Sequence, residues 1–291
     1  MRTLKIIHFN DVYHVEPLKK EPVGGAARFI SAINGYSQKQ QSLDNGNKPL
    51  VLFSGDAFNP SLESSVTKGE HMVPILNATQ ADVAVYGNHD FDFGVSVLAK
   101  LAAKCSFPWL LSNVFDSGTG KPLADGHEYL VIHRYGLKIG VIGIVEQEWL
   151  ETIPSLPPTV EYRDFVKTAK TLAQTLKNDH DCTFIIALTH MRIPNDEILS
   201  KECPEVDLIL GGHDHFFRVI GAQSENENEW RGKDIRVIKS GADFREVSFI
   251  SIDLDDTSKI QDVLGMFFLL SPSTVAYLPH SNLKTFLRST Q

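Results

Sequence analysis

The chain has 291 residues, of which 42% are hydrophobic and 22% are charged, with 28 Lys and Arg against 36 Asp and Glu. Enough apolar side chains are present to bury a core, which excludes a mainly disordered chain. The formal net charge of -8 argues against a general nucleic-acid binder, because a polyanion attracts basic proteins. If the substrate is an anion, bound metal ions or a local site must supply positive charge.

The first elements to be predicted are strands, since short apolar runs that end in polar clusters are typical of buried strands. In chain order these runs cover residues 4–9, 50–53, 83–86, 109–111, 137–145, 184–188 and 208–210. Helical spacing of apolar residues between several of them predicts helices over 26–33, 95–102 and 165–176. Strands that alternate with helices predict an α/β architecture.

The later part of the chain has a different pattern. Residues 128–145 hold two strand-like runs joined around Gly136, which predicts an antiparallel hairpin, and residues 235–254 are strand-like without a long helix. Polar, turn-rich stretches at 36–49, 116–126 and 224–233 are interpreted as surface loops. We expect one domain over 1–255. Residues 256–291 are then either a poorly ordered tail or the truncated start of a second domain.

The cysteines and the N-terminal residues give information on the cellular location of the protein. Cys105, Cys182 and Cys203 are isolated, which argues against a disulfide framework and against a cysteine zinc site. The first apolar run stops at Asn10, too early for a secretory signal, and no run reaches the roughly 18 residues of a membrane span. We therefore expect a cytoplasmic protein without a membrane partner. The sequence gives no indication of the oligomeric state.

Polar residues with metal-binding side chains follow the ends of five predicted strands. They are Asp11, Asp56, Asn88, His190, His213 and His215. Because ligands of open α/β sheets bind outside the carboxyl ends of the strands, these residues are expected to converge. Carboxylate, amide and imidazole donors suit Mn, Fe, Zn or Ni. Six donors exceed the need of one tetrahedral ion, whereas two ions that share Asp56 would use them all.

Each of these residues also has a simpler explanation when taken alone. An Asp after a strand is usually a turn or capping residue, and a single His at a strand end is usually a hydrogen-bonded surface residue. Independent caps would not assemble a complete ligand set in chain order, so the joint pattern favours a metal centre. His8 is interpreted as structural or as a support for a ligand. His71, His127, His133, His180 and His280 are interpreted as solvated or locally satisfied.

These motifs resemble the signature of the calcineurin-like metallophosphoesterases. The matching residues are Asn10-Asp11, Gly55-Asp56, Gly87-Asn88-His89-Asp90, His190 and Gly212-His213-Asp214-His215. The sequence GNHDFDFG at 87–94 is similar to the corresponding motif of the 5'-nucleotidase and UDP-sugar hydrolase branch. The resemblance implies a four-layer α/β/β/α sandwich, two β-sheets flanked by helices, with a dinuclear centre at the strand ends.

The resemblance also implies residue roles. One metal would take Asp11, Asp56 and His215, and the other would take Asp56, Asn88, His190 and His213. His89 would face the substrate phosphate, oriented by Asp92. A cationic imidazole there would stabilise charge on the transferring phosphoryl group.

The first motif departs from the family pattern. The usual motif of the family is Asp-x-His, but this chain has Asp11-Val12-Tyr13-His14. Either Tyr13 supplies an oxygen to the first metal, or His14 reaches it through a shifted turn, or the metal lacks that ligand. A phenol has an ordinary pKa of about 10, so only a strongly acidic ion such as ferric iron would hold Tyr13 as a phenolate.

The expected activity is hydrolysis of a small phosphorylated substrate by two divalent or mixed-valent transition metal ions, with a nucleotide phosphomonoester as the leading substrate. A phosphodiesterase or a broad phosphatase of the same fold is the first alternative. The full-length 5'-nucleotidases carry a separate C-terminal domain that holds the base, and about 35 residues after Asp256 are too few for it. A catalytically weak binding module is the second alternative.

Overall fold

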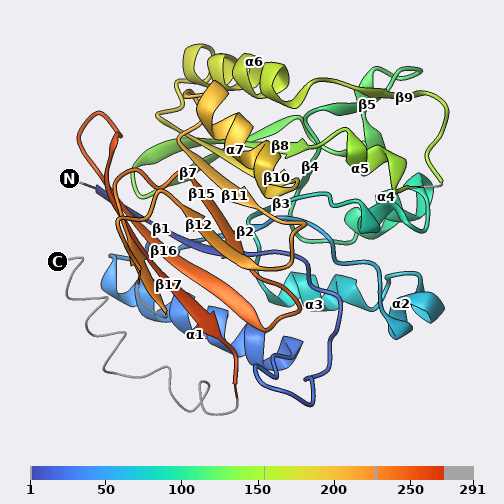
Figure 1. The fold of residues 1–291 in the computed structure, drawn as a ribbon, viewed down its shortest axis with the longest axis horizontal. Coiled ribbons are helices and arrows are strands. Elements are labelled where there is room, and N and C mark those ends of the chain that lie inside the picture. Colours follow the sequence, from blue (N-terminus) through green and yellow to red (C-terminus); the bar gives the residue numbers. More distant parts are fainter. Residues whose placement is uncertain (1, 154, 226–227, 272–291) are drawn as a thin grey trace.

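Two β-sheets lie face to face with helices on their outer sides (Figure 1). The computed structural model describes residues 2–153, 155–225 and 228–271. The predicted four-layer α/β/β/α class is confirmed.

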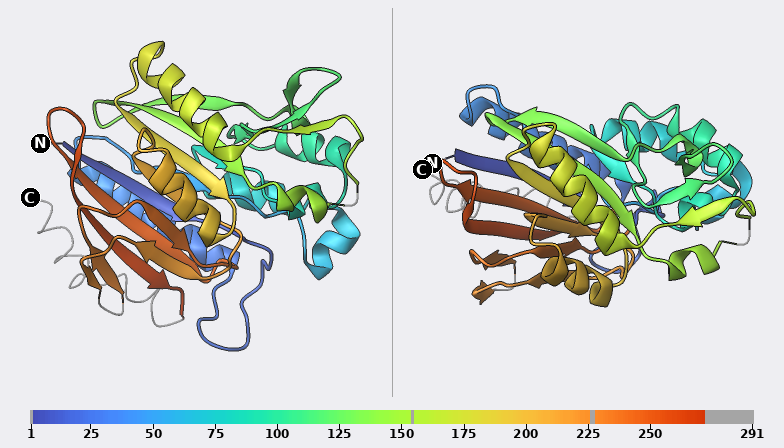
Figure 2. Two further views of the ribbon diagram at one scale, coloured as in Figure 1. Left: turned by 45° about the horizontal axis from the view of Figure 1, so that its top comes forward. Right: turned by 90° about the horizontal axis from the view of Figure 1, so that it is seen from above.

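The larger sheet has eight strands in the order β13-β14-β17-β16-β1-β2-β3-β4. Within it β1 to β4 run parallel, and β16 lies antiparallel to β1. Helix α1 packs on its outer side through edge-on contacts such as Phe29 against Phe9 (Figure 2). The strands are β1 (Arg2–Phe9), β2 (Leu50–Phe53), β3 (Val83–Val85), β4 (Trp109–Leu110), β13 (Ser224–Glu225), β14 (Glu229–Arg231), β16 (Glu246–Leu254) and β17 (Ile260–Leu269).

The smaller sheet has six strands in the order β12-β15-β11-β10-β8-β7. Strands β8, β10, β11 and β15 are parallel, and β7 forms the predicted hairpin with β8. Tyr135 and Gly136 in its turn both have positive φ, as a tight hairpin turn requires. The strands are β7 (Tyr129–Arg134), β8 (Leu137–Val145), β10 (Phe184–His190), β11 (Leu208–Gly211), β12 (Phe217–Ile220) and β15 (Val237–Ser240).

The remaining elements are short, apart from the helices that cover the sheets. A small sheet pairs β5 (Val114–Asp116) with β6 (Lys121–Pro122) and β9 (Val160–Tyr162). The helices are α1 (Ala26–Leu43), α2 (Leu62–Thr67), α3 (Met72–Ala78), η1 (His89–Phe91), α4 (Val95–Ala102), η2 (Leu123–Asp125), α5 (Glu148–Glu151), α6 (Phe165–Asn178) and α7 (Ile193–Glu202).

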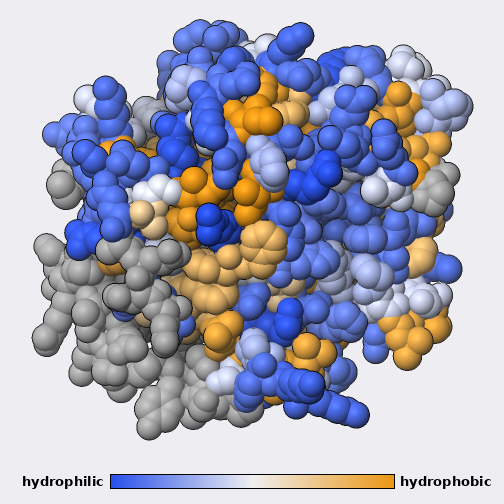
Figure 3. Space-filling model, viewed as in Figure 1, coloured by the Kyte–Doolittle hydropathy of each residue, from blue (hydrophilic) through white to orange (hydrophobic). Residues whose placement is uncertain are grey.

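The smaller sheet separates two apolar cores. Along β10, Ile186 and Leu188 face the larger sheet, whereas Ile185 and Ala187 face the layer of α6 and α7. Successive strand residues point to opposite sides, so burial on both sides produces the continuous apolar run seen in the sequence. The face shown in Figure 3 is mostly hydrophilic, with apolar side chains gathered near its centre. Among the described residues, no helix has the length and apolar character to cross a bilayer. The cytoplasmic location stays a prediction.

The prediction of a surface loop over 36–49 is wrong for its first half, because α1 extends to Leu43. Tyr36 and Gln40 continue the buried face of the helix at a spacing of four residues. Gln40 is polar but buried, and its Oε1 accepts a hydrogen bond from Lys5 Nζ at 2.7 Å. A buried glutamine whose partner lies on β1 cannot be recognised from local composition.

The other predicted loops and the tail also contain regular structure. Residues 116–126 include β6 and η2, and residues 224–233 include β13 and β14. The boundary expected at residue 255 falls in the turn between β16 and β17, and β17 pairs with β16 along its length. Residues 260–269 therefore belong to the larger sheet and not to a tail. The rest of the expected tail, 272–291, lies outside the described residues.

Candidate metal centre

The first donor set lies beyond the ends of β1, β2 and β11. Tyr13 Oη lies 3.0 Å from Asp11 Oδ1, 2.9 Å from Asp56 Oδ2 and 2.9 Å from His215 Nε2. His215 Nε2 lies 3.1 Å from Asp11 Oδ1. Three strand ends from two sheets thus bring three oxygens and one nitrogen together.

The second donor set begins at the same carboxylate oxygen. His190 Nε2 lies 3.2 Å from Asp56 Oδ2, and His213 Nδ1 lies 3.1 Å from Asn88 Oδ1. The rings of His190 and His213 are 5.1 Å apart. Every residue predicted at the strand ends therefore lies in one cluster, with Asp56 between its two halves.

The backbone at the site is unusual. Asp11, Asp56, His213 and His215 all have positive φ, between 53° and 79°. Non-glycine residues are uncommon there, and such strained conformations gather at functional sites. Close packing adds a second constraint, since a Cβ on Gly87 would lie 2.0 Å from Asp56 Oδ1. The glycine before Asn88 is therefore needed for the approach of the two loops.

Contacts on the outer side of the donors fix their orientation. His190 Nδ1 lies 2.7 Å from Ser54 O, so it donates to this carbonyl and leaves Nε2 facing the donors. Nε2 is buried and lies 3.2 Å from Asp56 Oδ2. Asp11 Oδ2 accepts hydrogen bonds from Asn10 Nδ2 at 2.7 Å and from the backbone N–H of His213 at 2.8 Å, which leaves Oδ1 for the centre. Such outer contacts are a general property of metal sites.

The electrostatics of the cluster favour a cation. Burial opposes the charged form of His190, but the carboxylates of Asp56 and Asp11 outweigh burial and raise its pKa to about 10. Burial lowers the pKa of His213 to about 4, with the charge of His190 acting in the same direction. Burial, with Asp56 and Asp11, raises the pKa of Tyr13. The carboxylates of Asp11 and Asp56 thus favour positive charge among the donors, and the donor chemistry fits a metal centre.

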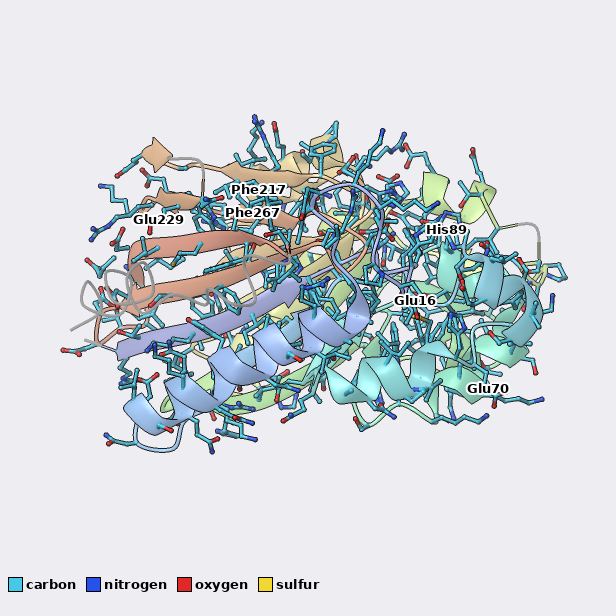
Figure 4. All side chains as sticks on the ribbon, turned by 90° about the horizontal axis from the view of Figure 1, so that it is seen from below. Glu16, Glu70, His89, Phe217, Glu229 and Phe267 are labelled. Atoms are coloured by element: carbon cyan, nitrogen blue, oxygen red, sulfur yellow. The ribbon has the colours of Figure 1, made fainter. Side chains whose placement is uncertain are left out.

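His89 lies beside the donors without joining either set. Its Nδ1 lies 2.8 Å from Asp92 Oδ2, and its side chain is 37% exposed. The hydrogen bond to Asp92 raises the pKa of His89, although burial opposes the charged form. Asp92 also accepts from Asn59 Nδ2 at 2.6 Å. Figure 4 labels His89 to the right of the strands of the sheets, beside short helices.

The other predicted histidines lie apart from the donor sets. His14 Nδ1 lies 3.0 Å from Asp243 Oδ1 and its side chain is half-exposed, so it does not reach the cluster. His8 is buried between the hydroxyls of Ser54 and Ser240, a structural position.

Sequence reasoning missed a buried carboxylate at a sixth strand end. Glu146 directly follows β8, and its Oε1 lies 3.8 Å from His213 Nε2. It accepts hydrogen bonds from Arg192 Nε at 2.7 Å and from Asn195 Nδ2 at 2.6 Å. The rule that found the other residues, a polar residue directly after a buried strand, would have found Glu146.

A buried lysine network behind the donors was also missed. Lys239 Nζ lies 2.9 Å from Asp196 Oδ2 and 2.7 Å from Asp214 Oδ2. It also donates to the carbonyls of Met191 and Gly212, at 2.6 and 2.5 Å. Lys239 therefore joins the segments that carry His190, His213 and His215. Burial opposes its charge, but Asp196 and Asp214 outweigh burial and raise its pKa.

Comparison with known proteins identifies the family of the chain. The family model of calcineurin-like phosphoesterases matches residues 4–217. The snake venom 5'-nucleotidase of Crotalus adamanteus is 25% identical over 290 residues, which cover 92% of this chain and 48% of that protein. The 5'-nucleotidase of Vibrio cholerae is 31% identical over 181 residues, which cover 58% of this chain and 32% of that protein. The chain thus spans half or less of the length of these relatives.

Two solved structures have the same fold. A 5'-nucleotidase precursor from Thermus thermophilus matches with a TM-score of 0.79 and 24% identity, covering 93% of this chain and 55% of that one. A calcineurin-like phosphoesterase from Bacillus subtilis matches with a TM-score of 0.72 and 20% identity, covering 99% of both chains.

Proposed function

Since the chain belongs to the calcineurin-like phosphoesterase family, we propose that it is a metal-dependent phosphomonoesterase whose main substrates are nucleoside 5'-monophosphates. The observation that carries this proposal is the pair of donor sets that share Asp56 Oδ2. The 5'-nucleotidases among the relatives support the choice of nucleotides. The proposed partner is a small phosphorylated molecule, and neither a nucleic acid nor a membrane is part of the proposal.

Two transition metal ions, chosen from Mn, Zn, Fe and Ni, are the proposed cofactors. Asp11, Asp56 and His215 would hold one, and Asp56, Asn88, His190 and His213 would hold the other. When bound, such ions hold phosphate oxygens and generate a hydroxide nucleophile from water at neutral pH.

The chain's own contribution to the reaction is proposed to come from His89 and Asp92. Asp92 fixes the ring of His89 through Nδ1, which leaves Nε2 for the substrate. It also favours the imidazolium, which stabilises charge on the phosphoryl group and donates a proton to the leaving oxygen.

A substrate panel before and after chelation tests the proposal. We expect turnover of 4-nitrophenyl phosphate and of nucleoside 5'-monophosphates that chelation abolishes and Mn²⁺ restores. Faster hydrolysis of bis(4-nitrophenyl) phosphate would favour a phosphodiesterase instead. No turnover with any of the four metals would leave a binding module and contradict the proposal.

His89→Gln separates catalysis from metal binding. We expect kcat for 4-nitrophenyl phosphate to fall by about 10²- to 10³-fold, as when one donor to a developing charge is removed. Metal content should be unchanged, because His89 belongs to neither donor set. Asp92→Asn should cost about tenfold, since it acts only through His89. Loss of a metal ion in His89→Gln would instead make this residue a ligand.

A further inference from the structure

Strand β7 forms one edge of the smaller sheet. Among the described residues it pairs with β8 on one side and with no strand on the other. We propose that this edge is an interface for a second copy of the chain, in which the two β7 strands pair antiparallel about a two-fold axis at Val131. The inference concerns residues outside both donor sets and does not depend on the proposed function.

The length and composition of β7 distinguish it from the strands at the other sheet edges. It has six residues, YLVIHR, whereas the other edge strands have two to four. Natural sheets protect a long edge with lysine, proline or a bulge. Strand β7 contains neither lysine nor proline, and its register with β8 is regular. Among the described strands, it therefore offers the longest row of edge backbone groups to another chain.

The apolar side chains of β7 are only partly buried. Leu130 and Ile132 pack on the core between the two sheets. Tyr129 and Val131 pack on the core beneath α6 and α7. All four remain partly exposed, whereas Ile139 of β8, which has a strand on each side, is fully buried. An added strand would cover the exposed flank of these side chains on both faces of the sheet at once.

The hairpin turn determines which backbone groups face the open edge. Tyr135 and Gly136 both have positive φ, and Arg134 pairs with Leu137, as in a two-residue turn of type I′. The residues that flank such a turn form a hydrogen-bonded pair, and this pattern alternates along the strand. Val131 lies three residues before Arg134, so its N–H and C=O point away from β8. These two groups are available to a neighbouring strand.

A two-fold axis at Val131 makes the edge complementary to itself. Val131 of each copy exchanges both backbone hydrogen bonds with Val131 of the other copy. In the same register Glu128, which directly precedes β7, lies opposite Arg134 of the other copy. Glu128 is exposed, and Arg134 is held in place by Asp82 at 2.7 Å. Opposite charges thus face each other twice across the axis, which favours a second copy over an unrelated strand.

The molar mass of the full chain in solution tests the inference. We expect light scattering after size-exclusion chromatography to show a dimer that dissociates on dilution. Val131→Pro should abolish the dimer, because proline lacks the N–H at the axis. Its fold should survive, since this N–H does not bond to β8, and circular dichroism checks that it does. The matched control is Val131→Thr, which keeps the N–H and the preference for a strand and should stay dimeric.

Glu128→Lys tests the charges without changing the backbone. It places like charges opposite each other at two positions, so the dissociation constant of the dimer should rise about tenfold. The control is Glu202→Lys, because Glu202 has the same charge and is exposed at the end of α7. Its dissociation constant should equal that of the wild type.

A cysteine at the axis reports the register of the two strands. Val131→Cys should form a disulfide-linked dimer on mild oxidation, since Cα atoms about 5.5 Å apart lie within reach of a disulfide. Lys201→Cys, on the exposed surface of α7, should not cross-link. A chain that stays monomeric at high concentration, a dimer that persists in Val131→Pro, or no cross-link in Val131→Cys would overturn the inference.

Discussion

His213→Ala is expected to lower turnover of 4-nitrophenyl phosphate by more than about 100-fold, the upper end of the loss caused by removing an outer partner of a metal ligand. His213 Nδ1 faces Asn88 Oδ1 in the second donor set, so its loss removes a direct donor. The second ion should be lost as well, which a metal analysis of the purified variant would show. Asn88→Ala should likewise lower turnover and remove the second ion, because Asn88 Oδ1 is the donor that faces His213 Nδ1.

The matched control is His133→Ala, because His133 is exposed on β7, away from the donors. Its turnover and metal content should equal those of the wild type. Circular dichroism should show that all three variants are folded. Wild-type turnover in both His213→Ala and Asn88→Ala would refute the metal assignment.

Lys239→Met is expected to lower the free energy of unfolding by about 3–5 kcal/mol, the usual cost of leaving a buried ion pair without one partner. Lys239 is fully buried, and its removal leaves Asp196 buried and weakly compensated. The carbonyls of Met191 and Gly212 lose a donor too. Urea unfolding monitored by circular dichroism measures the change.

Lys201→Met is the control for this prediction. Lys201 pairs with Glu197 on the surface of α7, where a helical ion pair contributes only about 0.5 kcal/mol or less. A loss below about 1 kcal/mol in Lys239→Met would show that the network contributes little to the stability of the fold.

The strands were predictable because burial on both sides leaves a continuous apolar run. Strands β2 and β8 have the bounds that their runs predict, and α4 has the bounds that its helical spacing predicts. The residues of the centre were predictable for a related reason, since each ends or follows a strand that the sequence marks. What the comparisons support is the family and the fold. The ligand roles stay predictions that the geometry supports.

The features that the sequence did not predict depend on contacts between residues far apart in the chain. Lys239 lies inside a buried strand, where a charge is expected only with partners, and those partners lie on other elements. The continuation of α1 depends on Gln40 meeting Lys5 of β1. The sequence of β17 does not alternate cleanly between apolar and polar residues, so it gave no strand signal. Its place in the larger sheet comes from backbone pairing with β16 on one side and β14 on the other. Pairing across the sheet, rather than local propensity, decides such segments.

Each donor set takes atoms from both sheets. Asp11, Tyr13, Asp56 and Asn88 follow strands of the larger sheet, whereas His190, His213 and His215 end or follow strands of the smaller one. An ion in either position would therefore cross-link the two layers, and its binding free energy would add to the cohesion of the sandwich. During synthesis on the ribosome, a nascent chain would have neither position complete until the region around residue 215 had emerged.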